Sequence, residues 1–142
     1  MLVDLGSAPP SNAYLTSVTL RRPEKHFPLR VFVCEQCWLV QAEDYSRAAE
    51  LFNDEYAYFS SFSAAWLEHS RAYTDLVVER FGINKDSFVV EVASNDGYLL
   101  QFFKDRSIPC LGIEPTSSTA SAARLKGIDT LEKFFGIDLA TE

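Results

Sequence analysis

The stretch Ser87–Lys104, SFVVEVASNDGYLLQFFK, decides the fold of the second half of this chain. A β-type apolar run, FVVEVA, passes through a small polar elbow, SNDG, into an apolar run at helical spacing. The pattern then repeats, with a strand in CLGIEP, a helix in TSSTASAARLK that Gly127 ends, and a last strand at IDT. This alternation predicts a parallel sheet with crossover helices, and therefore an α/β fold.

The elbow is the expected binding site, because open parallel sheets bind ligands at the carboxyl ends of their strands. A dinucleotide loop would follow the pattern G-x-G-x-x-G, whereas this elbow has one glycine, Gly97. Asp96 beside it would repel a pyrophosphate. NAD and FAD are therefore disfavoured. A ligand with an adenosine, a sulfonium and an ammonium group, such as S-adenosylmethionine, suits the acidic groups Glu91 and Asp96.

A second carboxylate supports this hypothesis. Glu114 ends the next strand, close to the roughly 20-residue offset at which an acidic residue binds ribose hydroxyls. The alternative is that Ser94, Asn95 and Asp96 only cap a helix and that Glu114 is an exposed strand terminus.

Several longer stretches carry a family resemblance. These are FVVEVASNDGYLLQFF, GIEPTSSTASAARLKGIDTLEKFFG, VCEQCWLVQ and NDEYAYFSSFSAAWLEHSRAY. Together they resemble the S-adenosylmethionine-dependent sugar C-methyltransferases, over nearly the whole chain and in the same order. The resemblance implies a zinc-binding domain followed by a Rossmann-type methyltransferase domain, and a nucleotide-linked deoxyketosugar as the substrate.

The resemblance also implies roles for individual residues. It assigns Glu114 to the ribose, Pro115 to the side of the adenine, and Tyr56–Ser61 to a stretch that passes over the methyl donor. The implied cofactor-binding residues are Tyr56, Tyr58, Ser60, Glu91, Ser94, Asn95, Asp96, Gly97, Glu114 and Pro115. The alternative for Tyr56–Ser61 is that its aromatic side chains are core that joins the two halves of the chain.

The N-terminal half contains a possible metal site. Two short β-type runs, with Val31 and Val33 before the cysteines and Val40 after them, fold back at a Cys-x-x-Cys turn. Cys34 and Cys37 are half of a tetrahedral zinc site, and the earlier Cys-x-x-Cys of the family is missing from this chain. Zinc is therefore possible, but the site is incomplete. A redox role would place the pair at a helix start, which this strand context disfavours.

Composition narrows the remaining classes of function. The chain has 142 residues with 20 acidic against 13 basic ones, a net charge of -7, which disfavours nucleic acid as a partner. No signal peptide and no membrane span is apparent, and three cysteines suit a reducing compartment, so we expect a cytoplasmic protein. The oligomeric state stays open.

The fold expected from these observations is a truncated Rossmann-type methyltransferase sheet (85–142), preceded by a small β-rich zinc-domain remnant (1–45) and a helical linker region (46–84). The linker contains a short helix over Ser46–Tyr56, with Ser46 as its N-cap. A long helix follows over Ser63–Phe81, with Leu67 and Ser70 on the flank of an apolar face made of Trp66, Tyr73, Leu76, Val77 and Phe81. The family's catalytic base lies beyond this sequence, so we assign no catalytic residue and expect no methyl transfer by the chain alone. The alternative function is a non-catalytic binding or interaction module that kept the fold without the ligand.

Overall fold

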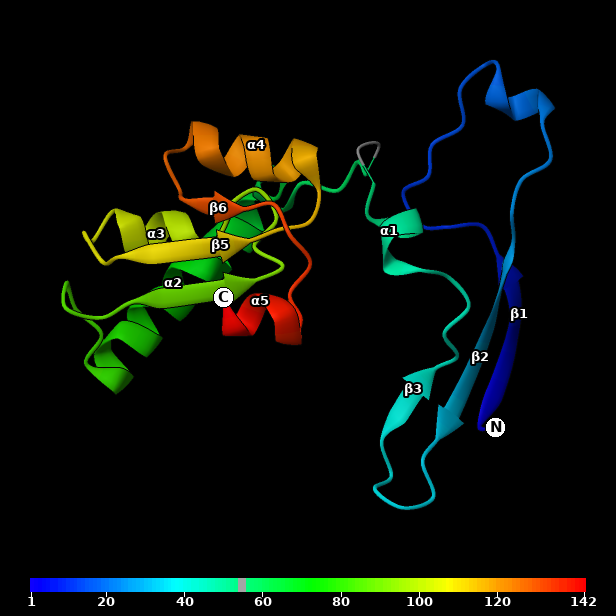
Figure 1. The fold of residues 1–142 in the computed structure, drawn as a ribbon, viewed down its shortest axis with the longest axis horizontal. Coiled ribbons are helices and arrows are strands. Elements are labelled where there is room, and N and C mark those ends of the chain that lie inside the picture. The colour runs from blue at the N-terminus through cyan, green and yellow to red at the C-terminus, as the bar shows by residue number, and fades with distance from the viewer. Residues whose placement is uncertain (54–55) are drawn as a thin grey trace. The chain divides into compact units, whose positions relative to one another are not determined.

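The computed structural model describes residues 1–53 and 56–142, which form two compact units, Met1–Ala57 and Tyr58–Glu142. Each unit has its own three-stranded sheet (Figure 1). The long helix belongs to the same unit as the parallel sheet. The division into regions 1–45, 46–84 and 85–142 stays a prediction about domain organisation.

The first unit is an antiparallel sheet. Its strands β1 (Val3–Ala8), β2 (Phe27–Val33) and β3 (Val40–Ala42) pair in the order β1-β2-β3, with Val31 opposite both Val3 and Ala42. The predicted reversal at the cysteines is confirmed, because the backbone N–H of Cys34 donates to the carbonyl of Leu39 at 2.9 Å. None of the described residues of this unit is buried, so it has no hydrophobic core of its own.

The short helices of the first unit are a 3-10 turn at Thr19–Arg21 and α1 (Ala48–Leu51). The prediction that Ser46 caps α1 is wrong. Arg47 occupies the N-cap position, without a side-chain cap, and the hydroxyl of Ser46 donates to the carbonyl of Arg47. The predicted helix included Asp54 and Glu55, which lie outside the described residues.

The second unit has the predicted alternation of strands and helices. In sequence order it contains a 3-10 turn (Ser60–Phe62), α2 (Ala64–Phe81), β4 (Val89–Val92), α3 (Leu100–Lys104), β5 (Cys110–Ile113), α4 (Ser117–Leu125), β6 (Thr130–Leu131) and α5 (Ile137–Thr141). The three strands are parallel, in the order β4-β5-β6. Sequential parallel strands joined by helices are the Rossmann-like arrangement that the sequence predicts.

Helix α2 confirms both predicted ends but not the predicted face. Ser63 caps its start by accepting from the backbone N–H of Trp66, and Gly82 ends it in the left-handed region at φ 64°. Most of the predicted face is exposed and only Val77 of it packs against the core, whereas Thr74 and Ser70, which was expected on the flank, are buried. Their hydroxyls donate to carbonyls four residues earlier, so these small side chains pack closely without an unpaired donor.

The core of this unit lies on one face of the parallel sheet. It is built from Leu100, Phe103, Ile108, Ala123 and Ile128, with Val77, Val78, Ile83, Val89, Leu99 and Cys110 packed against them. Helices α2, α3 and α4 all contribute to this cluster. On β4, which runs along one edge of the sheet, Val90 and Val92 are 48% and 50% exposed, because they point to the opposite face from Val89.

No helix in the described part of the chain is both long enough and apolar enough to cross a bilayer.

Candidate functional site: the elbow after strand β4

The elbow between β4 and α3 has an unusual backbone. Ala93, Asn95 and Gly97 all have positive φ, at 60°, 50° and 75°. Left-handed conformations are uncommon for residues other than glycine, and clusters of them persist where surrounding contacts enforce them, often at functional sites. The elbow is therefore a tightly specified loop at the carboxyl end of β4.

Glu114 joins this elbow to the end of β5. Its carboxylate is 4% exposed and accepts two backbone N–H groups, from Asn95 at 2.9 Å and from Thr116 at 3.0 Å. The alternative of an exposed strand terminus is wrong. Each carboxylate oxygen can accept a second hydrogen bond, so Glu114 keeps acceptor capacity for a ligand.

The elbow side chains do not cap the following helix. Helix α3 has Leu99 at its N-cap and no side-chain cap. Asn95 instead binds the segment Tyr58–Ser61: its amide donates to the carbonyl of Tyr58 at 3.0 Å and accepts from the N–H of Ser60 at 2.9 Å. Asn95 and Ser60 are both buried, so this contact shapes the elbow from the upstream side.

The elbow also contains an ion pair that the sequence analysis missed. Lys126 Nζ lies 3.3 Å from Asp96 Oδ2 and donates to the backbone carbonyl of Asp96 at 2.7 Å. Asp96 was expected to offer its negative charge to a ligand. Its Oδ2 is therefore paired with a lysine, whereas its Oδ1 has no partner among the described residues.

Glu91 and Tyr98 form a second polar pair beside the elbow. Burial, opposed by the hydrogen bond from Tyr98, raises the pKa of Glu91 to about 8, and the charges of Asp96 and Glu114 add to the rise. Burial, together with the nearby Glu91, raises the pKa of Tyr98 to about 12. Glu91 is therefore largely protonated at neutral pH.

Four buried oxygens near the elbow have no hydrogen-bond partner among the described residues. They belong to Glu91, Ser94, Asp96 and Thr116. Buried polar atoms without partners are rare, and each calls for a ligand, a water or another explanation. Thr116 was not among the predicted residues, because a threonine after a strand carries no distinctive sequence signal.

Gly97 and Ser94 have packing roles. A Cβ atom on Gly97 would lie 2.4 Å from Ile128 Cδ1, so the absence of a side chain here makes room for the core side chain of Ile128. A Cβ on Gly112 would lie 2.4 Å from Ser94 Oγ, which shows that Ser94 packs against β5.

The other predicted residues are less closely joined to the elbow. Pro115 is half-buried between Glu114 and Thr116, and Tyr58 is 49% exposed and contributes its carbonyl. Tyr56 falls in the first unit, where its ring packs against Phe52 at a centroid distance of 5.3 Å.

Cys34 and Cys37 lie in the turn between β2 and β3 and are not joined by a disulfide. Hydrogen bonds from the backbone N–H groups of Cys37 and Gln36, and from the Cys37 thiol, lower the pKa of Cys34. This favours a thiolate, which is the form that binds zinc. Within the described residues, however, no three His, Cys, Asp or Glu side chains lie together to hold a metal ion. His26 pairs with Glu24 at 3.7 Å. These residues therefore do not fit a complete zinc site within one chain.

We expect the purified chain to hold well under one zinc ion per molecule, because two thiolates leave half of the tetrahedral shell empty. Elemental analysis measures this directly. Half an ion per chain in a dimer would indicate a site shared by two chains. One tightly held ion per monomer would contradict the prediction.

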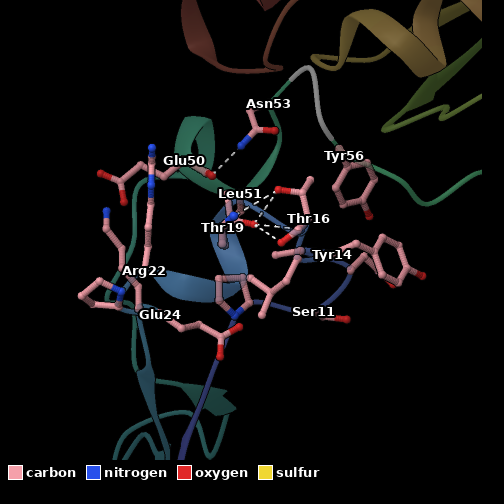
Figure 2. Close-up of a pocket in the computed structure, with 16 residues that line it drawn as sticks. Ser11, Tyr14, Thr16, Thr19, Arg22, Glu24, Glu50, Leu51, Asn53 and Tyr56 are labelled. Carbon is pink, nitrogen blue, oxygen red and sulfur yellow. Dashed lines mark hydrogen bonds between the residues drawn. The ribbon is translucent and has the colours of Figure 1, made fainter.

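A hollow of about 520 Å³ lies elsewhere in the first unit (Figure 2). Its lining carries two cations, Arg22 and Lys25, and two anions, Glu24 and Glu50, so the charges balance. None of its described lining residues is buried. Because this lining is exposed and its charges balance, it favours no particular class of ligand. We therefore assign no ligand to this hollow.

Two comparisons with known proteins match this chain. Residues 1–52 match a family described as a putative zinc binding domain. The chain is also 31% identical over 141 residues, 99% of its length, to the C-methyltransferase NovU of Streptomyces niveus. The chain is thus similar to a C-methyltransferase along nearly its whole length. The resemblance noted in the sequence is thus confirmed, and the chain spans about a third of the length of that relative, 33%.

Proposed function

We propose that this chain is part of a C-methyltransferase and binds S-adenosylmethionine at the elbow after β4, as the cofactor-binding part of an enzyme that methylates a nucleotide-linked deoxyketosugar. The observation that carries the proposal is the buried carboxylate of Glu114 at the end of β5, hydrogen-bonded to the elbow backbone. When bound, the cofactor supplies an electrophilic methyl group. Cys34 and Cys37 are also proposed to bind zinc, with the remaining ligands supplied by a second chain or by another molecule.

The chain's own residues fit the chemistry of this cofactor. The free acceptor positions on Glu114 suit ribose hydroxyls, which donate charge-assisted hydrogen bonds to carboxylates. The unpartnered Oδ1 of the buried Asp96 suits a donor such as an ammonium group. A cationic ligand near Glu91 would also favour the charged form of that carboxylate. Binding should therefore release a proton at neutral pH.

This chain is proposed to bind the cofactor, and no methyl transfer is proposed for the chain alone. We assign no residue of this sequence as the base that would remove the proton beside the sugar keto group. Tyr58 and Ser60 are proposed to shape the site through the contacts of Asn95. Pro115 is proposed to lie beside the adenine.

Calorimetric titration with S-adenosylhomocysteine tests the proposal. We expect the parent chain to bind, and Glu114→Gln to weaken binding by about 10- to 100-fold, because a hydrogen bond to a charged group contributes roughly 1.5 to 3 kcal/mol. Asp129→Asn is the matched control, since it removes one exposed carboxylate and should leave affinity unchanged.

Three results would count against the proposal. Equal affinities for the parent and Glu114→Gln would place the ligand elsewhere. Tighter binding of NADH than of S-adenosylhomocysteine would indicate a dinucleotide site. Failure of the folded parent to bind either ligand would favour the alternative, an interaction module without a cofactor.

A further inference from the structure

Lys126 sits where three parts of the second unit meet. It follows the last residue of α4, and its side chain is 32% exposed. Its Nζ donates to Ser61 Oγ at 2.5 Å and to the Asp96 carbonyl at 2.7 Å, and it lies 3.3 Å from Asp96 Oδ2. A lysine ammonium has three donors, so these three acceptors occupy all of them.

Ser61 is held from two sides. Its backbone N–H donates to Asp96 Oδ2 at 3.2 Å, while its hydroxyl accepts from Lys126. Because Ser60 also donates to Asn95, the segment before α2 is fastened to the elbow by neighbouring bonds. Lys126 adds a contact to both the segment and the elbow from a third part of the unit, the end of α4.

The pair also changes the electrostatics of the elbow. Asp96 is 3% exposed, and a buried carboxylate without a partner would carry a large desolvation cost. Lys126 compensates its charge from the α4 side. A cationic ligand at the elbow would therefore meet an Asp96 whose charge Lys126 largely compensates.

We propose that Lys126 is a positioning residue of the cofactor site, which clamps the Tyr58–Ser61 segment onto the elbow. Lys126 also compensates the charge of Asp96, and this reduces the preference of the site for a cationic over a neutral ligand. The clamp stands on the contacts alone, whereas the effect on ligand choice rests on the proposed function. S-adenosylmethionine carries a sulfonium cation, whereas S-adenosylhomocysteine carries a neutral thioether, so the pair of ligands reports the charge directly.

The first measurement needs no ligand. In Lys126→Met, amide hydrogen exchange at Ser61 should accelerate by about tenfold or more, because the local opening free energy falls when the clamp is lost. Lys126→Arg should restore much of the protection. Lys85→Met is the control, since it removes one exposed lysine from the turn before β4 and should leave Ser61 unchanged. Unchanged exchange at Ser61 in Lys126→Met would overturn the clamp.

The second measurement is the ratio of the two dissociation constants, S-adenosylhomocysteine over S-adenosylmethionine. Lys126→Met exposes the Asp96 charge and should raise the ratio by about five- to tenfold, as expected for one unit charge at intermediate distance and dielectric. Asp96→Asn leaves the lysine uncompensated and should lower the ratio. The double variant should return the ratio to that of the parent.

A purely structural role predicts a different outcome. Both affinities would then fall together in Lys126→Met with an unchanged ratio, and that result would overturn the electrostatic part. If Lys126→Met does not fold, Asp96→Asn still decides whether the ratio of dissociation constants responds to the charge at the elbow. A folded parent that binds neither ligand would refute the proposed function and the ligand effect with it, while the exchange data would still decide the clamp.

Discussion

Gly97→Ala is expected to destabilise the second unit by about 2 to 5 kcal/mol. A residue with a Cβ at φ 75° costs roughly 1 to 2 kcal/mol. The new methyl group would also lie 2.4 Å from Ile128 Cδ1 and 3.4 Å from Ala123 Cβ, in the core. Overpacking of this kind costs roughly 1 to 3 kcal/mol. Urea unfolding followed by far-ultraviolet circular dichroism reports on this unit, since it contains the longest helices.

Two further variants separate the two costs. Gly82→Ala meets nothing within 4 Å at a similar φ of 64°, so it should lose only the conformational part. Ile128→Val removes the clashing atom, at a cost of about 0.5 to 1.5 kcal/mol when made alone. The double variant Gly97→Ala with Ile128→Val should therefore lose less than the sum of its parts. Strict additivity, or equal losses at Gly82 and Gly97, would show that the close approach to Ile128 is not limiting.

The stability of the second unit is expected to fall as the pH rises from about 4.5 to about 8. Burial raises the pKa of Glu91 from 4.5 to about 8, so the folded state holds a proton that the unfolded state has released. Stability falls with pH wherever the folded state binds more protons than the unfolded state. One pKa unit corresponds to about 1.4 kcal/mol, and partial exposure reduces the effect, so the loss should be several kcal/mol at most.

Glu91→Gln tests this source of pH dependence. A glutamine cannot ionise, so the variant should lose most of the slope and should be more stable than the parent at pH 8. Tyr98→Phe removes the hydrogen bond that lowers the pKa of Glu91, so the decline should extend to higher pH. Urea unfolding at several pH values measures both effects. Parallel curves for Glu91→Gln and the parent would show that another group controls the slope.

Local signals in the sequence were sufficient to predict most of the secondary structure. The alternation of strands and helices after Phe88, the turn at Cys34 and Cys37, and the ends of α2 at Ser63 and Gly82 all depend on residues near one another in the chain. The start of α1 shows the limit, because the helix begins one residue later than predicted, with Arg47 at the N-cap and no side-chain cap, and the hydroxyl of Ser46 donates to the carbonyl of Arg47.

The sequence also indicated which loop forms the candidate site and that Glu114 belongs to it. Both inferences need only the strand order, because the carboxyl ends of adjacent parallel strands share one edge of the sheet. The partners of these residues could not be predicted in this way. Asn95 meets Tyr58 across 37 positions, and Lys126 meets Ser61 across 65.

Tertiary structure decided which faces are buried and which charges are compensated. Helix α2 buries Ser70 and Thr74 while most of its predicted apolar face stays exposed, because the helix packs closely against its neighbours and the hydroxyls are satisfied within the helix. Asp96 was expected to be a free charge but is paired with Lys126. Hydrophobic pattern and charge sign are properties of single residues and can be read from sequence. Burial and ion pairing depend on which distant segment lies opposite, and only the folded chain determines that.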